Sequence, residues 1–154
     1  MLFSKKAKEP EKKLALLYPE NVKVGCKADT KENVIRTVGQ MLVDSGYVNP
    51  SYVDAMVKRE ETFSTFMGNG LALPHGVEEA KKEVKASGIA VMVFPDGTDW
   101  GGETVQVVVG IAGVGDDHLA ILGVIAEQML EEGALEKLTS GSADDVYQML
   151  KGEE

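Results

Sequence analysis

Two nearly continuous apolar runs constrain the fold of this chain more than any other feature. Residues 88–94 and 105–112 are almost entirely apolar, and the second run is rich in β-branched valine. Runs of this length suit buried strands, because a helix that spans a bilayer needs about 20 apolar residues. We expect the first strand to stop at a turn over residues 95–97, and a loop to follow at residues 100–103.

Helical spacing of apolar residues predicts three longer helices. Thr30 can cap the first, and Pro50 starts the second, which carries a charged last turn at residues 58–61. Asp116 or Asp117 can cap the third. The expected apolar positions of the third helix are Leu119, Leu122, Ile125, Ala126 and Met129.

Shorter segments complete an alternating pattern of strands and helices. Residues 22–24 and 71–73 have the composition of short strands. Residues 134–139 and the segment capped by Ser142 have the composition of short helices. Strands interleaved with helices predict an α/β fold in which helices cover the sheet.

The size and charge of the chain exclude several classes of protein. A length of 154 residues suits one domain, which we place at residues 14–154 behind a charged, flexible leader at residues 1–13. A net charge of -9 disfavours nucleic acid or an anionic membrane as the main partner, because both need a basic face. With no signal peptide and one cysteine, Cys26, the expected location is the cytoplasm.

One of the two histidines lies in an unusual backbone setting. Residues 68–76 hold three glycines, one proline and His75. Pro74 has no backbone donor and keeps the preceding residue extended, so the strand must end where His75 begins. Gly76 then allows the chain to turn away. A lone histidine is more often structural than catalytic, but these neighbours indicate that His75 is held in place for chemistry.

A second histidine follows a strand in the same way. His118 comes after a glycine-rich loop and starts a helix, where free backbone N–H groups favour an anion. Two histidines at strand ends, with Arg59 before the first, suggest the handling of a phosphoryl group. A neutral imidazole such as that of His75 is a good nucleophile, and Arg59 and His118 could stabilise the charge of a loose transition state.

Other interpretations of these residues stay open. A metal hydrolase would use His75, His118 and a carboxylate such as Asp116, although no His-x-x-x-His ligand pair is present. A regulatory binding module that keeps His75 is a second alternative. We expect Cys26 to be a small buried apolar residue outside any relay, because only one neighbouring lysine favours its thiolate.

From about residue 22 to residue 150 the chain resembles the enzyme IIA component of the sugar phosphotransferase system, mannitol/fructose class. The Leu-Pro-His-Gly motif at residues 73–76 carries the resemblance together with other segments in order. The further segments are Arg59-Glu60 and residues 113–119, and, as in the mannitol branch, residues 46–48, 52–56 and 109–112. Asn69 departs from the mannitol branch, which often has an acidic residue there.

The resemblance implies a mixed five-stranded sheet with helices on both sides, and a phosphocarrier without cofactor or metal. By this resemblance, His75 accepts phosphate from phospho-HPr and passes it to a cysteine of an enzyme IIB partner, which serves a membrane enzyme IIC. Positions matching His118 and Arg59 assist. Mannitol is the expected substrate of the system, and a fructose-specific or nitrogen-regulatory enzyme IIA is the alternative.

The residues just before His75 predict a docking surface. Phe63, Phe66, Met67 and Leu71 cannot all be core residues at their spacing. We expect them to form an apolar patch around His75 that binds two partners in turn.

Overall fold

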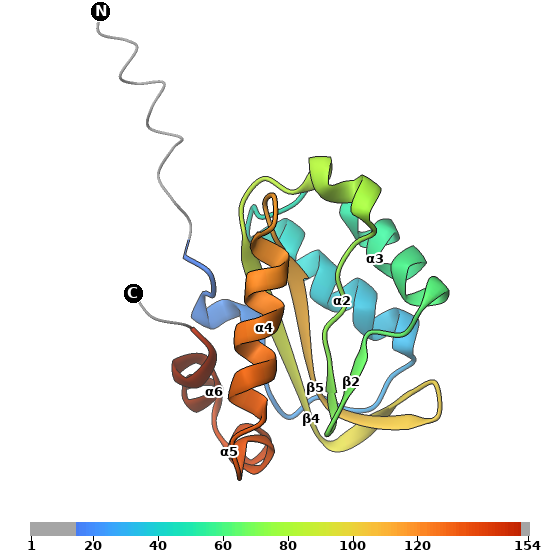
Figure 1. Cartoon of the computed structure of the whole chain (residues 1–154). Coiled ribbons are helices and arrows are strands. Elements are labelled where there is room, and N and C mark those ends of the chain that lie inside the picture. Colours follow the sequence, from blue (N-terminus) through green and yellow to red (C-terminus); the bar gives the residue numbers. More distant parts are fainter. Residues whose placement is uncertain (1–14, 152–154) are drawn as a thin grey trace, which may run out of the picture.

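The sheet has five strands in the order β1-β4-β5-β3-β2, in a computed structural model that describes residues 15–151 (Figure 1). The strands are β1 (Val22–Lys23), β2 (Phe66–Gly68), β3 (Leu71–Ala72), β4 (Gly88–Trp100) and β5 (Glu103–Ala112). The pairs β1–β4 and β3–β5 are parallel, whereas β4–β5 and β2–β3 are antiparallel. The expected mixed sheet is therefore confirmed; the leader expected at residues 1–13 lies outside the described residues.

Helices cover both faces of this sheet. They are η2 (Pro19–Asn21), α2 (Lys31–Asp44), α3 (Ser51–Thr62), η3 (Glu78–Glu83), α4 (Asp117–Met129), α5 (Ala134–Ser140) and α6 (Ala143–Leu150). Figure 1 shows α2 and α3 on one side of β4 and β5, and α4, α5 and α6 on the other. The predicted α/β architecture is thus confirmed. Within residues 15–151, no helix is both long and apolar enough to cross a membrane.

Residues 88–94 of β4 and 107–112 of β5 are apolar throughout because both faces of the sheet are covered there. Ala90, Met92 and Phe94 of β4 belong to the core cluster under α2 and α3. Ile89, Val91 and Val93, which alternate with them, belong to the cluster under α4, α5 and α6. Successive side chains of a strand point to opposite faces, so a strand covered on both sides needs apolar residues at every position.

The predicted end of the first long strand is wrong. β4 does not stop at residues 95–97 but continues to Trp100, and residues 100–103 contain the tight hairpin turn into β5 rather than a longer loop. Its register against β5 shifts between Val93 and Thr98. This irregularity takes up Pro95, whose carbonyl oxygen accepts a hydrogen bond of 2.9 Å from Gln106 Nε2. A β-bulge tolerates a proline that a regular ladder would not.

Two predicted helix starts are confirmed and a third is corrected. Thr30 Oγ1 accepts a hydrogen bond of 3.2 Å from the backbone of Asn33, and Ser142 forms a reciprocal capping box at the start of α6. At α4 neither aspartate caps through its side chain: Asp116 occupies the cap position without a side-chain bond. Asp117 instead accepts a hydrogen bond of 2.7 Å from the hydroxyl of Ser87, 30 residues earlier.

The predicted apolar face of α4 is partly wrong. Ile125 and Met129 are buried as expected, and Ile121 joins them. Leu119, however, has an exposed fraction of 59%. It lies on the first turn of the helix, where the side chain points to solvent beside His118 rather than to the sheet.

Candidate functional site

His75 lies where β3 ends, as the sequence predicts. The chain leaves β3 after Ala72 and makes one further parallel bridge, between His75 and Ile111 of β5. The backbone N–H of Ile111 donates to the carbonyl of Pro74 at 2.9 Å. The segment that carries His75 is therefore fixed to the buried end of β5.

The ring of His75 is oriented by a hydrogen bond from its own segment. Its Nδ1 lies 2.9 Å from the carbonyl oxygen of Leu73. A carbonyl can only accept, so Nδ1 carries the hydrogen and Nε2 of the neutral ring keeps its lone pair. Burial lowers the pKa of His75, and the nearby charge of Arg59 lowers it further, against the opposing effect of the bond to Leu73. The ring is thus a neutral nucleophile at cell pH.

His118 faces His75 across the start of α4. The centroids of the two rings are 6.0 Å apart, with an angle of 36° between their planes. Gly113 makes this approach possible, because any side chain at this position would collide with the backbone of His118. Among the described residues, Nδ1 of His118 is buried and has no hydrogen-bond partner. It is therefore available to a group that enters the site.

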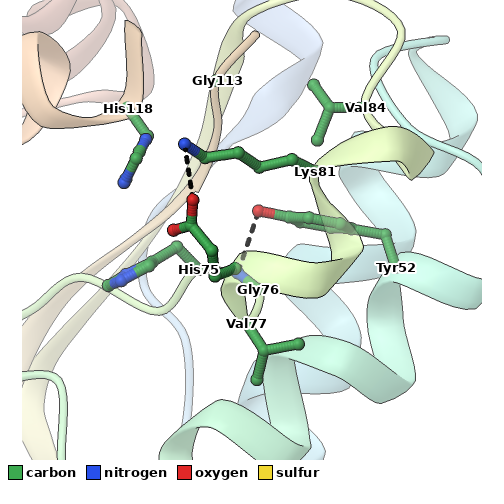
Figure 2. A pocket seen from close by; sticks show the side chains of 9 residues that line it. Tyr52, His75, Gly76, Val77, Lys81, Val84, Gly113 and His118 are labelled. Atoms are coloured by element: carbon green, nitrogen blue, oxygen red, sulfur yellow. Dashed lines mark hydrogen bonds and ion pairs between the residues drawn. The ribbon is translucent and has the colours of Figure 1, made fainter. Parts of the chain in front are cut away.

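Tyr52 of α3 ties the two strand ends together. Its buried hydroxyl donates to the carbonyl oxygen of Ile111 at 2.9 Å and accepts from the backbone N–H of Gly76 at 2.9 Å (Figure 2). A Cβ atom at Gly76 would come within 2.6 Å of the Tyr52 ring. Tyr52 thus holds the turn after His75 in place, a role that its position on the apolar face of a helix did not reveal.

The two histidines share a small pocket of about 20 Å³. Its lining residues are Tyr52, His75, Gly76, Val77, Glu78, Lys81, Val84, Gly113 and His118. Lys81 and Glu78 come from η3. Figure 2 shows the Lys81 side chain extending across the pocket toward His118. The pocket therefore holds a cation that sequence reasoning missed.

Arg59 lies close to this site without lining the pocket. It is half-buried in the last turn of α3, where Nη1 donates to the carbonyl oxygen of Phe63 and the guanidinium lies 5.8 Å from the centroid of the Phe63 ring. Its charge acts on the pKa of His75. The structure thus places both predicted histidines in the pocket lining, and Arg59 outside that lining but near enough for its charge to lower the pKa of His75.

The buried carboxylate of Glu60 holds the end of α3. It accepts hydrogen bonds from Trp100 Nε1 at 3.0 Å, from the backbone of Thr65 at 3.1 Å, and from Lys31 Nζ at 3.3 Å. Burial by itself would raise the pKa of Glu60, but the hydrogen bonds from Thr65 and Ser64 and the charge of Lys31 keep it below its usual value. These hydrogen bonds position the helix turn that carries Arg59, and no local sequence pattern predicted them.

Within the part of the chain that the structure describes, neither Cys26 nor the acidic residues form an alternative site. The Cys26 thiol is half-buried and donates to the carbonyl oxygen of Lys23 at 3.5 Å, and burial raises its pKa. It is therefore a protonated thiol at neutral pH. Between residues 15 and 151 no group of three or more His, Cys, Asp or Glu side chains could hold a metal ion, which leaves the metal-hydrolase alternative without a site in that part of the chain.

Asn69 has a structural reason for its identity. It occupies the two-residue turn between β2 and β3 with a φ of 51°, followed by Gly70 with a φ of 75°. Two successive positive φ angles form the turn that Asn-Gly favours most strongly in hairpins. Asn69 is not among the residues that line the pocket.

The expected docking patch is only partly exposed. Leu71 is buried in the sheet, and Phe66 is half-buried and packs against the core under α2 and α3, so the prediction is wrong for these two. Phe63 and Met67 have exposed fractions of 72% and 51%. The alternation of side chains along β2 separates Phe66 from Met67.

Known proteins match this chain along most of its length. Residues 15–153 match the family described as phosphoenolpyruvate-dependent sugar phosphotransferase system, EIIA 2. The mannitol-specific phosphotransferase enzyme IIA component of Halalkalibacterium halodurans is 49% identical over 136 residues, which cover 88% of this chain and 94% of that protein. The protein of the same name from Bacillus subtilis is 46% identical over 133 residues, covering 86% of this chain and 93% of that protein.

Solved structures give the same result. The crystal structure of IIA mannitol from Escherichia coli has a TM-score of 0.80 and 36% identity, and the match covers 86% of this chain and 97% of that chain. In a solution complex of the Escherichia coli mannitol enzyme IIA with phosphorylated enzyme IIB, the matching chain has a TM-score of 0.83 and 35% identity, with 90% and 100% covered. By sequence and fold, this chain belongs to the EIIA 2 family of the phosphoenolpyruvate-dependent sugar phosphotransferase system, and is a phosphotransferase component.

Proposed function

We propose that this protein is a cytoplasmic phosphocarrier for mannitol uptake, with His75 as the residue that carries the phosphoryl group. His75 accepts the group from phospho-HPr and passes it to a cysteine of an enzyme IIB partner, which supplies a membrane enzyme IIC. The relatives from Halalkalibacterium halodurans and Bacillus subtilis are both named mannitol-specific, which favours mannitol over fructose. A neighbouring structure contains an enzyme IIA with phosphorylated enzyme IIB, which supports that acceptor.

The orientation of the His75 ring carries this proposal. The bond from Nδ1 to Leu73 leaves Nε2 as the nucleophile, and the lowered pKa keeps the ring neutral. Nε2 attacks the phosphorus of the donor, a new N–P bond forms, and the N–P bond to the donor histidine breaks. The ring becomes positive as Nε2 is phosphorylated, and the carbonyl of Leu73 stabilises that charge through the hydrogen on Nδ1.

His118 and Arg59 support the same step. The transferring group passes through a loose transition state with negative charge on its three equatorial oxygens. His118 faces His75 from 6.0 Å, and Arg59 has N–H donors beyond the one that binds Phe63. In the second half of the reaction, the thiolate sulphur of the partner attacks phosphorus and returns His75 to its neutral form.

Exposed apolar side chains beside both helper residues would receive the partners. Phe63 and Met67 follow Arg59 by four and eight residues, Val114 and Leu119 lie before and after His118 in the chain, and all four are at least 46% exposed. We call these four residues the docking surface. Isolated apolar side chains on a surface are ordinary, but several in the segments that carry Arg59 and His118 suit transient partners.

Phosphorylation from purified components tests the proposal. The protein is mixed with phosphoenolpyruvate, enzyme I and HPr, and its intact mass is measured. We expect one added phosphoryl group that is labile in acid and stable in base, no such group in His75→Ala, and transfer to a mannitol enzyme IIB in preference to a fructose enzyme IIB. A phosphoryl group on His75→Ala would overturn the assignment.

The role of His118 has its own test. His118→Ala should keep the thermal midpoint of the wild type but transfer phosphate to enzyme IIB roughly a hundredfold more slowly or worse, because an electrostatic donor at a transition state commonly contributes several kcal/mol. Full transfer activity in this variant would leave His118 as a helix-start residue only.

A further inference from the structure

Lys81 is a charged residue of the pocket with no part in the scheme described so far. Its side chain is 29% exposed and runs along the pocket that His75 and His118 line. Its Nζ lies 3.0 Å from Oε2 of Glu78 and 3.9 Å from Oδ1 of Asp116. A cation that lines a site proposed to take up a dianion is a candidate for binding that dianion.

The carboxylate of Glu78 occupies the place that an anion would take. Glu78 lines the pocket beside both histidines and holds the Lys81 ammonium, although its side chain is 75% exposed. Asp116, the other partner of Lys81, is 92% exposed. Exposed ion pairs contribute little to stability, so these contacts exchange easily. A phosphoryl group, with close to two negative charges and three acceptor oxygens, competes strongly for the same ammonium.

One polar atom of this pocket has no hydrogen-bond partner within residues 15–151. It is Nδ1 of His118, which is buried, and His118 lines the same pocket as Lys81 (Figure 2). A buried ring nitrogen without a partner carries a desolvation penalty that an incoming hydrogen-bonding group would remove. Lys81 and His118 therefore present two complementary groups to the same small volume.

From this geometry we propose that Lys81 binds the phosphoryl group on His75, and that Glu78 holds the ammonium until that group arrives. The inference rests on the proposed phosphorylation of His75. On phosphorylation, the Glu78 carboxylate is repelled into solvent and the Lys81 ammonium moves to the phosphoryl oxygens. No bond other than the transferred N–P bond changes, and no proton is exchanged. Glu78 thereby determines how readily His75 accepts and releases the phosphoryl group.

The proposal predicts opposite effects for two neighbouring substitutions. Lys81→Met removes the cation but keeps an apolar stem of similar length, and should slow phosphorylation by HPr roughly tenfold. Glu78→Gln removes the competing charge and keeps the shape. It should raise the equilibrium constant for transfer from phospho-HPr by about threefold to fivefold, since one nearby charge in a solvated site has an effect of this order. Lys81→Arg should restore most of the rate.

Matched controls come from the same turn. Lys82→Met and Glu79→Gln make the same changes of charge at exposed positions that do not line the pocket. Rates are measured by rapid quench and intact mass, and equilibria from mixtures with HPr at low and at moderate salt. The effects of Lys81→Met and Glu78→Gln should exceed those of their controls at both salt concentrations, because local contacts are screened less than distant charges.

The outcomes separate this inference from the function beneath it. If wild-type protein is not phosphorylated on His75, the proposed function fails. If it is phosphorylated but Lys81→Met behaves as Lys82→Met does, or Glu78→Gln lowers the equilibrium constant, the role of Lys81 and Glu78 is wrong. Glu78 is mostly exposed, so Glu78→Gln tests the inference even if Lys81→Met does not fold.

Discussion

Replacing Tyr52 with phenylalanine would remove one oxygen atom and two hydrogen bonds at the site. The Tyr52 hydroxyl bonds to the carbonyl of Ile111 and to the N–H of Gly76, each at 2.9 Å. Burial raises the pKa of Tyr52, so the hydroxyl remains protonated and able to donate. In Tyr52→Phe both backbone groups lose their partner, while the ring still fills its space.

The expected loss of stability follows from these two bonds. A buried backbone group left without a partner costs about 1–3 kcal/mol. Because the turn at Gly76 is only partly buried and can recruit water, we expect a total of about 2–4 kcal/mol rather than the sum of two full penalties. For a domain of this size, each kcal/mol lowers the thermal midpoint by about 2–4 °C, so the midpoint should fall by roughly 5–15 °C.

The same substitution should slow phosphoryl transfer. Gly76 follows His75 directly, so loosening this turn lets the nucleophile leave its productive orientation, and we expect a loss of roughly tenfold in the rate constant for transfer. Tyr52 is buried and cannot touch a partner protein, so the concentration of HPr that gives half the maximal rate should stay unchanged. Rapid-quench kinetics at several HPr concentrations separate the two quantities.

Tyr18→Phe is the matched control. It also removes a tyrosine hydroxyl, which within residues 15–151 accepts a single, exposed hydrogen bond from Ala15. Its midpoint and transfer rate should equal those of the wild type. If Tyr52→Phe is as stable and as active as Tyr18→Phe, the two hydrogen bonds do not position His75 and the reasoning is refuted.

Four further outcomes are expected. Glu60→Gln should lower the free energy of unfolding at pH 7 by about 1–3 kcal/mol in urea titrations. This difference from the wild type should shrink as the pH falls through the lowered pKa of Glu60. A difference that does not change with pH would contradict the lowered pKa of Glu60. Titration of His75 by NMR should give a midpoint below about 6.5. The unfolded chain binds a proton on His75 more readily than the folded chain does, so the stability that neutral His75 contributes at higher pH should be lost as the pH falls through the folded pKa. Cys26→Ser should accept and donate phosphate at the native rate, and a large loss with an intact fold would show that the thiol takes part. Gly113→Ala should displace His118, and so lower both the thermal midpoint and the rate of transfer to enzyme IIB; native values for both would mean that the backbone absorbs the collision.

Local patterns in the sequence determined most of the secondary structure. The runs at residues 88–94 and 105–112 predicted β4 and β5 because burial on two faces demands apolar residues throughout a strand. The cap at Thr30 was predictable because its bond to Asn33 spans only three residues. Pro74 and Gly76 located His75 at a strand end for the same reason, since each acts on its own backbone.

Contacts between distant segments decided the rest. The bond from Ser87 that draws Asp117 away from capping spans 30 residues, and the bond from Trp100 to Glu60 spans 40. The path of β4 past Pro95 depended likewise on its pairing with β5, since a proline stops an isolated strand but not one that can bulge against a partner.

The composition of the pocket was decided in the same way. The residues next to each histidine predicted both of them as site residues, whereas Lys81 resembled an ordinary surface lysine. Only the fold places η3 beside the start of α4, so that Lys81 lines the same pocket as both histidines and pairs with Asp116, 35 positions further along the chain. The sequence shows which side chains are charged, but the charged groups that surround each of them depend on how the strands and helices pack.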